Sequence, residues 1–345
     1  MLAVNCRGQS DDLRDHLGSG VKHMKTAQFG VCEKSWEAQP TQAVQTARRV
    51  KSYKSFRSVG FIGWIPLVVL PSISAVIRRG LQPWAFMWTL AISIYFGLKW
   101  LTWWRLQRPV SHSAWRSVAY LLAWPGMDAE SFLDETKSPP APRFRSWLWA
   151  IFETGLGATL LWFVARTLPP EQPLLRGWTG MLGLTLLLHF GTFQIAALFW
   201  QSLGVDASPI MAAPLRAQSL SQFWGKRWNL GFRQLAHDLI FVPFHKYLQA
   251  GLVAFLVFLS SGLIHDLVIS VPAQAGYGLP TAYFMLQGLG VTLERSPLGK
   301  QLGLGKGLRG WSFMVLVAAG PVFWLFHPPF VMRVIIPFMK AIHAL

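Results

Sequence analysis

The chain has 345 residues, of which 52% are hydrophobic and only 14% are charged, and its formal net charge is +17. A soluble domain carries about 25% charged residues, so this composition excludes an ordinary soluble protein and indicates a membrane protein. The positive charge does not indicate nucleic-acid binding, because the Lys and Arg residues fall between apolar segments, where the positive-inside rule expects them on cytoplasmic loops. Cys6 and Cys32 both precede the first apolar run and form neither a disulfide framework nor a zinc site.

The N-terminal segment differs from the rest of the chain. Residues 1–57 are polar, mixed in charge and without sustained periodicity, and they end in a basic cluster. The start lacks the apolar stretch of a secretory signal, so we interpret the segment as a cytoplasmic tail. Residues 58–345 are expected to form one multi-pass membrane domain.

Apolar runs with about the length that a bilayer core requires follow one another along this domain. The sequence predicts spanning helices at 59–77, 82–103, 146–166, 178–200, 249–270, 277–294 and 311–326, and a short eighth helix at 330–345. Many of the 18 Trp residues lie where an apolar run begins or ends, which is typical of an interfacial aromatic belt. The predicted fold is therefore an all-α polytopic membrane protein with 7–8 transmembrane helices.

Three polar loops separate these runs and carry most of the Lys and Arg residues outside the tail, at 105–144, 201–248 and 295–309. An N-in arrangement puts the tail and all three loops on the cytoplasmic side, as the positive-inside rule requires. In the second loop, residues 218–248 have apolar side chains at mixed helical spacing. They are predicted to form an amphipathic helix or helix pair that lies at the membrane interface.

Two short stretches in this part of the chain carry the strongest functional signal. Residues 223–229 read Phe-Trp-Gly-Lys-Arg-Trp-Asn, and residues 261–266 read Ser-Gly-Leu-Ile-His-Asp within an apolar run. An ionisable side chain in such a run is costly and indicates a functional site. The two motifs, in this order, resemble the membrane-bound O-acyltransferase superfamily and, within it, the wax-synthase-like branch. The resemblance covers about 105–310, with dense motif matches at 206–266, and the turn at 124–128 is also similar to that branch.

His265 is the first candidate for catalysis. An apolar helix disfavours a charged imidazole, and a neutral imidazole is a competent general base. Ser261 and Gly262 are small neighbours that leave room for a substrate or for another helix, and Ser261 is a candidate substrate-binding residue. A packing histidine fits the same pattern, whereas the resemblance implies that His265 is the catalytic base. Asp266 faces about 100° away on a helix, so we expect it to be structural.

Asn229 is the second candidate, because an amide donates and accepts hydrogen bonds at once. The resemblance implies that Asn229 orients the alcohol or the thioester carbonyl, and a helix-capping or turn asparagine is the alternative. Lys226 and Arg227 are candidates for binding the phosphates of coenzyme A, with lipid headgroups as the alternative. Trp224 and Trp228 are candidates for the mouth of a substrate tunnel, with interfacial packing as the alternative.

The resemblance implies an acyltransferase that moves a fatty acyl group from acyl-CoA to a lipophilic alcohol. The resemblance implies wax ester synthesis, and the alternative acceptors are a sterol, a diacylglycerol, a sugar or a secondary-metabolite alcohol. No metal is expected, because the sequence has no tight histidine cluster, and acyl-CoA is expected as co-substrate in place of a cofactor. The cell membrane or the endoplasmic reticulum is the expected location. The rival from another class is a transporter whose path is lined by His265, His189 and Glu153, although no paired halves are evident.

Overall fold

The computed structural model describes residues 60–106 and 113–345. The described residues all belong to one compact unit, Arg57–Leu345. The predicted tail at 1–57 therefore lies outside the described residues. Throughout the described ranges the regular structure is helical, and no strand occurs there.

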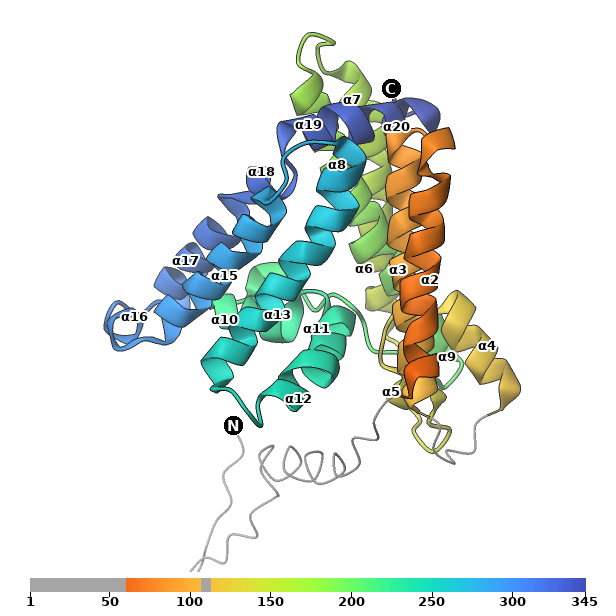
Figure 1. The fold of residues 1–345 in the computed structure, drawn as a ribbon, viewed down its shortest axis with the longest axis vertical. Coiled ribbons are helices and arrows are strands. Elements are labelled where there is room, and N and C mark those ends of the chain that lie inside the picture. Colours follow the sequence, from red (N-terminus) through yellow and green to blue (C-terminus); the bar gives the residue numbers. More distant parts are fainter. Residues whose placement is uncertain (1–59, 107–112) are drawn as a thin grey trace, which may run out of the picture. The chain divides into compact units, whose positions relative to one another are not determined.

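Six of the described helices are long and apolar enough to cross a membrane, which confirms the predicted all-α polytopic fold (Figure 1). They are Phe61–Gly80 (α2 and the 3-10 turn η1), Pro83–Arg105 (α3), Phe144–Thr167 (α6, η2 and α7), Pro173–Ser202 (α8, η3 and α9), Ala250–Ala273 (α13, η7 and α14) and Gly307–Leu325 (α17 and α18). Pro66 and Pro71 lie inside α2, where a membrane helix tolerates proline. The fourth span begins five residues before its predicted start at 178, because Pro173 pre-sets the first helical turn.

Two predicted helices do not meet the length and composition of a span. The predicted span at 277–294 is α15 (Leu279–Arg295), which has 17 residues. The predicted eighth helix begins earlier, with α19 (Pro328–Phe330), and continues through a π-helical turn into α20 (Ile336–Ala341). The spans that length and composition define are thus fewer than the 7–8 expected.

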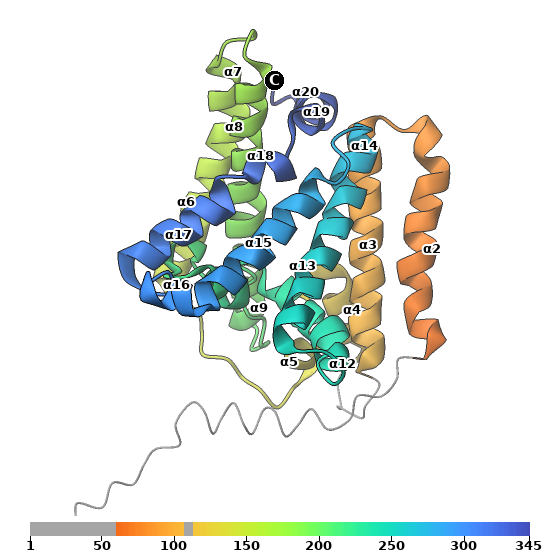
Figure 2. The ribbon, with the colours of Figure 1, turned by 60° about the vertical axis from the view of Figure 1, so that its left-hand side comes forward.

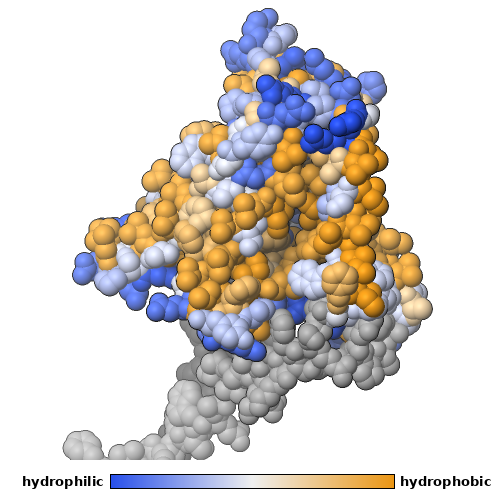
Figure 3. All heavy atoms as spheres, in the orientation of Figure 1, coloured by the Kyte–Doolittle hydropathy of each residue, from blue (hydrophilic) through white to orange (hydrophobic). Residues whose placement is uncertain are grey.

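The segments that join the spans gather at two opposite ends of the described unit (Figures 1 and 2). The basic loops at 113–143, 203–249 and 296–306 lie at one end, and the links at 78–82, 168–172 and 274–278 lie at the other with α20. Between the two ends, apolar side chains cover much of the visible surface (Figure 3). The three loops that the sequence analysis identified as basic thus lie at one end, whereas the link at 78–82 at the other end also carries Arg78 and Arg79.

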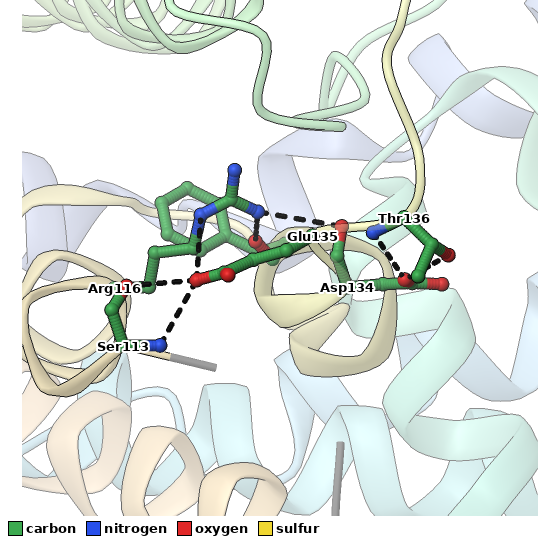
Figure 4. A network of polar contacts seen from close by, with 6 residues as sticks. Ser113, Arg116, Asp134, Glu135 and Thr136 are labelled. Atoms are coloured by element: carbon green, nitrogen blue, oxygen red, sulfur yellow. Dashed lines mark hydrogen bonds and ion pairs between the residues drawn. The ribbon is translucent and has the colours of Figure 1, made fainter. Parts of the chain in front are cut away.

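The segment 105–144 was expected to be a polar loop, and this expectation is wrong for two stretches, which form α4 (Ala114–Ala123) and α5 (Ala129–Leu133). Arg116 of α4 is buried and donates to the carbonyl oxygens of Phe132 and Asp134, each at 3.3 Å (Figure 4). Glu135 receives hydrogen bonds from the Ser113 amide and hydroxyl. The Thr136 hydroxyl holds the pKa of Asp134 below its usual range. Such long-range polar contacts give no periodic signal in the sequence.

Candidate functional site

His265 ends α13, where the helix passes into the π-helical turn η7 (Asp266–Ser270). π-Helical turns inside α-helices occur frequently at functional sites. The ring nitrogen Nδ1 lies 2.6 Å from the carbonyl oxygen of Ser261, one turn back. A carbonyl oxygen only accepts, so in the neutral ring Nδ1 carries the proton and Nε2 has a free lone pair. Nε2 makes no hydrogen bond within the described part of the chain. The ring therefore presents a basic nitrogen that can take a proton from a ligand.

Helix α15 joins this histidine to the other motif. The ring of Phe284 lies with its centroid 4.5 Å from that of His265 and 5.8 Å from that of Trp224. Phe258, in α13, contacts Trp224 from another side at 6.0 Å. The two motifs are separated in the sequence, and each of them contacts the ring of Phe284.

Two buried polar side chains of α15 fix the motif segment to the same helix face. Gln287 accepts a hydrogen bond from the indole Nε1 of Trp224 at 3.3 Å and donates to the carbonyl of Val317 at 2.8 Å. Glu294 accepts from the backbone amides of Leu220 and Ser221. The sequence analysis missed both. The available signal was their spacing, since Phe284, Gln287 and Glu294 lie three and seven residues apart, on one stripe of an apolar helix.

The segment 218–248 forms a helix pair, as predicted, with a break between its members. The first part is α10 (Leu220–Gln222) with the π-helical turn η5 (Phe223–Arg227), and the second is α11 (Leu230–Ala236), η6 (His237–Phe241) and α12 (Val242–Phe244). In the first part, Leu220 and Phe223 are buried in a core with Val291 and Met314, so its apolar side chains pack against other helices of the protein. The polar groups that α15 supplies satisfy backbone amides of this part and make the packing favourable.

Asn229 separates the two parts and adopts a left-handed backbone conformation, with φ +40° and ψ +63°. Asparagine tolerates this region better than most residues. Its Oδ1 accepts from the amide of Phe232 at 3.1 Å and so caps α11. In the described ranges, its side-chain NH₂ group has no hydrogen-bond partner, and no hydrogen bond joins Asn229 to His265. The structure thus gives Asn229 the capping role that the sequence left open, and leaves its donor available.

The other motif residues have different surroundings. Lys226 is exposed. Arg227 donates from Nη1 to the carbonyls of Ala212 at 3.0 Å and Ala213 at 3.3 Å, so it ties the motif to the preceding loop. Trp228 stacks on Phe223, with ring centroids 5.4 Å apart. The Ser261 side chain is buried, and its carbonyl orients His265.

Asp266 connects the end of α13 to the start of α15. One carboxylate oxygen accepts from the Ser270 hydroxyl at 2.8 Å and the Gly278 amide at 2.9 Å, and the other accepts from the Thr281 amide at 3.1 Å and from the Thr281 hydroxyl. A carboxylate is favourable at a helix N-terminus. The two helices approach closely here: a Cβ at Gly262 would lie only 2.7 Å from the Cα of Thr281, so this position requires glycine. This geometry supports the structural role expected for Asp266.

The remaining ionisable candidates do not assemble with His265. His189 lies in the π-helical turn η3 (Leu186–Thr192), and its Nδ1 is buried without a partner in the described ranges. His237 pairs with Asp238 at 3.1 Å. No group of three or more His, Cys, Asp or Glu side chains in the described residues is arranged to hold a metal ion.

Comparison with known proteins agrees with the motifs. Residues 207–286, which include both motifs and Phe284, match the family model described as "Membrane bound O-acyl transferase family". The chain is 28% identical over 152 residues to "Probable long-chain-alcohol O-fatty-acyltransferase 2" of Arabidopsis thaliana, which is 39% of this chain and 42% of that protein. It is 33% identical over 104 residues to "Probable long-chain-alcohol O-fatty-acyltransferase 9" of the same plant, which covers 28% and 30% of the two chains. With the "Long-chain-alcohol O-fatty-acyltransferase" of Simmondsia chinensis it shares 29% identity over 147 residues, which covers 38% and 40%.

These similarities confirm the resemblance to the membrane-bound O-acyltransferase superfamily and to its wax-synthase-like branch. The matched part spans less than half the length of each of these relatives.

Proposed function

We propose that this protein is a membrane-embedded O-acyltransferase that transfers a fatty acyl group from acyl-CoA to the hydroxyl of a lipophilic alcohol. The observation that carries the proposal is the state of His265, whose Nδ1 is held by the Ser261 carbonyl and whose Nε2 has no partner in the described structure. The names of the similar proteins support alcohol acylation as the reaction.

In this mechanism His265 Nε2 takes the proton of the alcohol hydroxyl as the oxygen attacks the thioester carbonyl. The new C–O bond forms and the C–S bond breaks, and the CoA thiolate leaves with the proton that His265 returns. The apolar surroundings exclude water and so limit hydrolysis of the thioester. Holding two apolar substrates in register can contribute roughly 7–11 kcal/mol to lowering the barrier.

Asn229 is proposed to donate from its NH₂ group to the thioester carbonyl or the alcohol while its Oδ1 caps α11. Asn229→Asp keeps an oxygen for the cap and removes the donor, so it separates the two roles. We expect its turnover to fall about 10²–10³-fold, as the loss of one positioned donor does, with little change in thermal unfolding. Asn229→Ala should lose the donor and also about 1 kcal/mol of helix capping. Normal turnover in Asn229→Asp would leave capping as the only role.

Lys226 is proposed to pair with the phosphates of coenzyme A, because it is exposed beside Asn229 on the side of the basic loops. Lys226→Gln should raise the KM for acyl-CoA by about tenfold, which corresponds to roughly 1.4 kcal/mol, and should leave the KM for the alcohol unchanged. Lys300→Gln, in another basic loop of the same end, is the matched control. If Lys226→Gln raised the KM for a short thioester donor that lacks the nucleotide by the same factor, the result would contradict the assignment. Arg227 is unsuited to this test, because its removal also frees the carbonyls of Ala212 and Ala213.

The proposed reaction is tested with membranes that contain the protein, labelled acyl-CoA, and a panel of long-chain alcohols, a sterol and a diacylglycerol. The expected product is an ester of a long-chain alcohol, identified by mass, together with free CoA. An ester formed only with the sterol or the diacylglycerol would change the acceptor. Absence of every ester from correctly inserted protein would overturn the acyltransferase proposal.

A further inference from the structure

A lysine is buried inside a membrane-spanning helix and has no acidic partner. Lys99 of α3 is 0% exposed, and none of the ion pairs among the described residues involves it. Its Nζ donates to the carbonyl oxygen of Gly126 at 2.5 Å and lies 3.2 Å from the centroid of the Tyr120 ring. An ionisable group at such a place is costly and therefore indicates a function.

The contacts of Lys99 fix a turn, residues 124–128, that joins α4 to α5. Tyr95, one helical turn before Lys99, donates its hydroxyl hydrogen to the carbonyl of Trp124 at 3.0 Å. The hydroxyl of Tyr120 is hydrogen-bonded to Thr102, which holds the ring against Nζ of Lys99. Helix α3 thus holds two carbonyls of the turn, and the hydrogen bond from Nζ and its contact with the Tyr120 ring offset part of the burial cost.

On its other side, the turn supports the helix that Asn229 caps. A Cβ at Gly231, in α11, would lie 3.3 Å from the amide nitrogen of Met127 and 3.8 Å from the Cα of Gly126. Glycine at this position leaves the two backbones in close contact, with little room to spare for a side chain. Asn229 lies two residues earlier and caps this helix. The order of contacts is therefore Lys99, the turn, Gly231 and the Asn229 cap.

We propose that Lys99 is a positioning residue that places the Asn229 amide, by fixing the 124–128 turn on which α11 rests. The inference depends on the proposed function for its effect on turnover, whereas the packing itself can be measured without activity. Lys99 touches neither motif directly and acts only through the turn.

The packing is measured with a disulfide between Met127→Cys and Gly231→Cys, in a chain with Cys6→Ser and Cys32→Ser. The Cβ of Met127 lies 3.8 Å from the Cβ position at Gly231, which is suitable for a disulfide. We expect rapid cross-linking with Lys99 present and about tenfold slower cross-linking in Lys99→Met. Without Lys99 the 124–128 turn is no longer fixed, so the two Cβ atoms spend less time at the separation that a disulfide requires. Thr89→Val is the matched control in the same helix, since the Thr89 hydroxyl bonds only to the carbonyl of Ala85. Equal rates in Lys99→Met and the control overturn the proposal, even if no ester is ever formed.

The link to the site is measured by a double-mutant cycle. Lys99→Met should lower kcat by about tenfold to a hundredfold, as a misplaced group does, and leave the KM for acyl-CoA unchanged. In an Asn229→Asp background, which already lacks the donor, the same change should have little further effect. Full additivity of the two losses overturns the proposal. If Lys99→Met fails to insert, Tyr95→Phe removes the neighbouring bond to the same turn and should slow cross-linking in the same direction; an unchanged rate in that variant also overturns it.

Discussion

Replacement of His265 by alanine is expected to abolish ester formation while expression and membrane insertion stay intact. General-base catalysis contributes about 10²–10⁴-fold to a rate, and the alanine side chain has no group that can take the proton. The measurement is the rate of ester formation per amount of inserted, folded protein. His245→Ala is the matched control, because His245 is exposed and stacks on Phe241, outside both motifs.

A second variant separates the loss of the base from the loss of packing against Phe284, whose ring lies 4.5 Å from the imidazole. His265→Asn retains an NH₂ donor for the Ser261 carbonyl and lacks a basic nitrogen. It should be as inactive as His265→Ala and closer to the wild type in thermal unfolding. Turnover above a few per cent of wild type in His265→Asn would falsify the assignment of His265 as the base.

The spans could be predicted from the sequence because length and apolar content are local properties of the chain. Helix α15 shows the limit of that reasoning. It lies in a predicted apolar run, yet it is short and carries Gln287 and Glu294 buried against other segments. Its importance comes from tertiary contacts with Trp224, Leu220 and His265, which hydropathy does not report.

In the candidate site, too, some contacts follow from local spacing in the sequence, and others depend on the tertiary fold. The bond from His265 to the Ser261 carbonyl follows from helical spacing, since the residues are four apart. The left-handed backbone of Asn229 and the contacts of Arg227 with Ala212 depend on how the loop folds. Lys99 is near the end of its span, where a lysine ordinarily extends its charge into water. Only the position of the 124–128 turn shows that its ammonium group is buried instead.

Replacement of Asp266 by alanine is expected to cause the largest loss of stability among these variants. Its carboxylate accepts from the amides of Gly278 and Thr281 and from the hydroxyls of Ser270 and Thr281. Loss of the acceptor leaves the Gly278 amide and the amide and hydroxyl of Thr281 without this partner, whereas the Ser270 hydroxyl keeps the Gly276 carbonyl. Each buried unpaired group costs about 1–3 kcal/mol, less where water reaches it. The Ser270 hydroxyl also lies 3.4 Å from Nε2 of buried His327, so the loss of Asp266 also changes the surroundings of this histidine.

The measurement is thermal unfolding in detergent together with the rate of ester formation. Asp266→Asn keeps one acceptor oxygen, so we expect the order of stability to be wild type, then Asp266→Asn, then Asp266→Ala. Glu171→Gln, in the exposed link between α7 and α8, is the control for loss of a carboxylate. Turnover should fall with stability, because α15 carries the Phe284 ring that contacts His265. If Asp266→Asn unfolded like the wild type but lost all turnover, the carboxylate would act on the reaction itself. If Asp266→Ala unfolded like the wild type, the contacts of Asp266 would not hold α13 to α15.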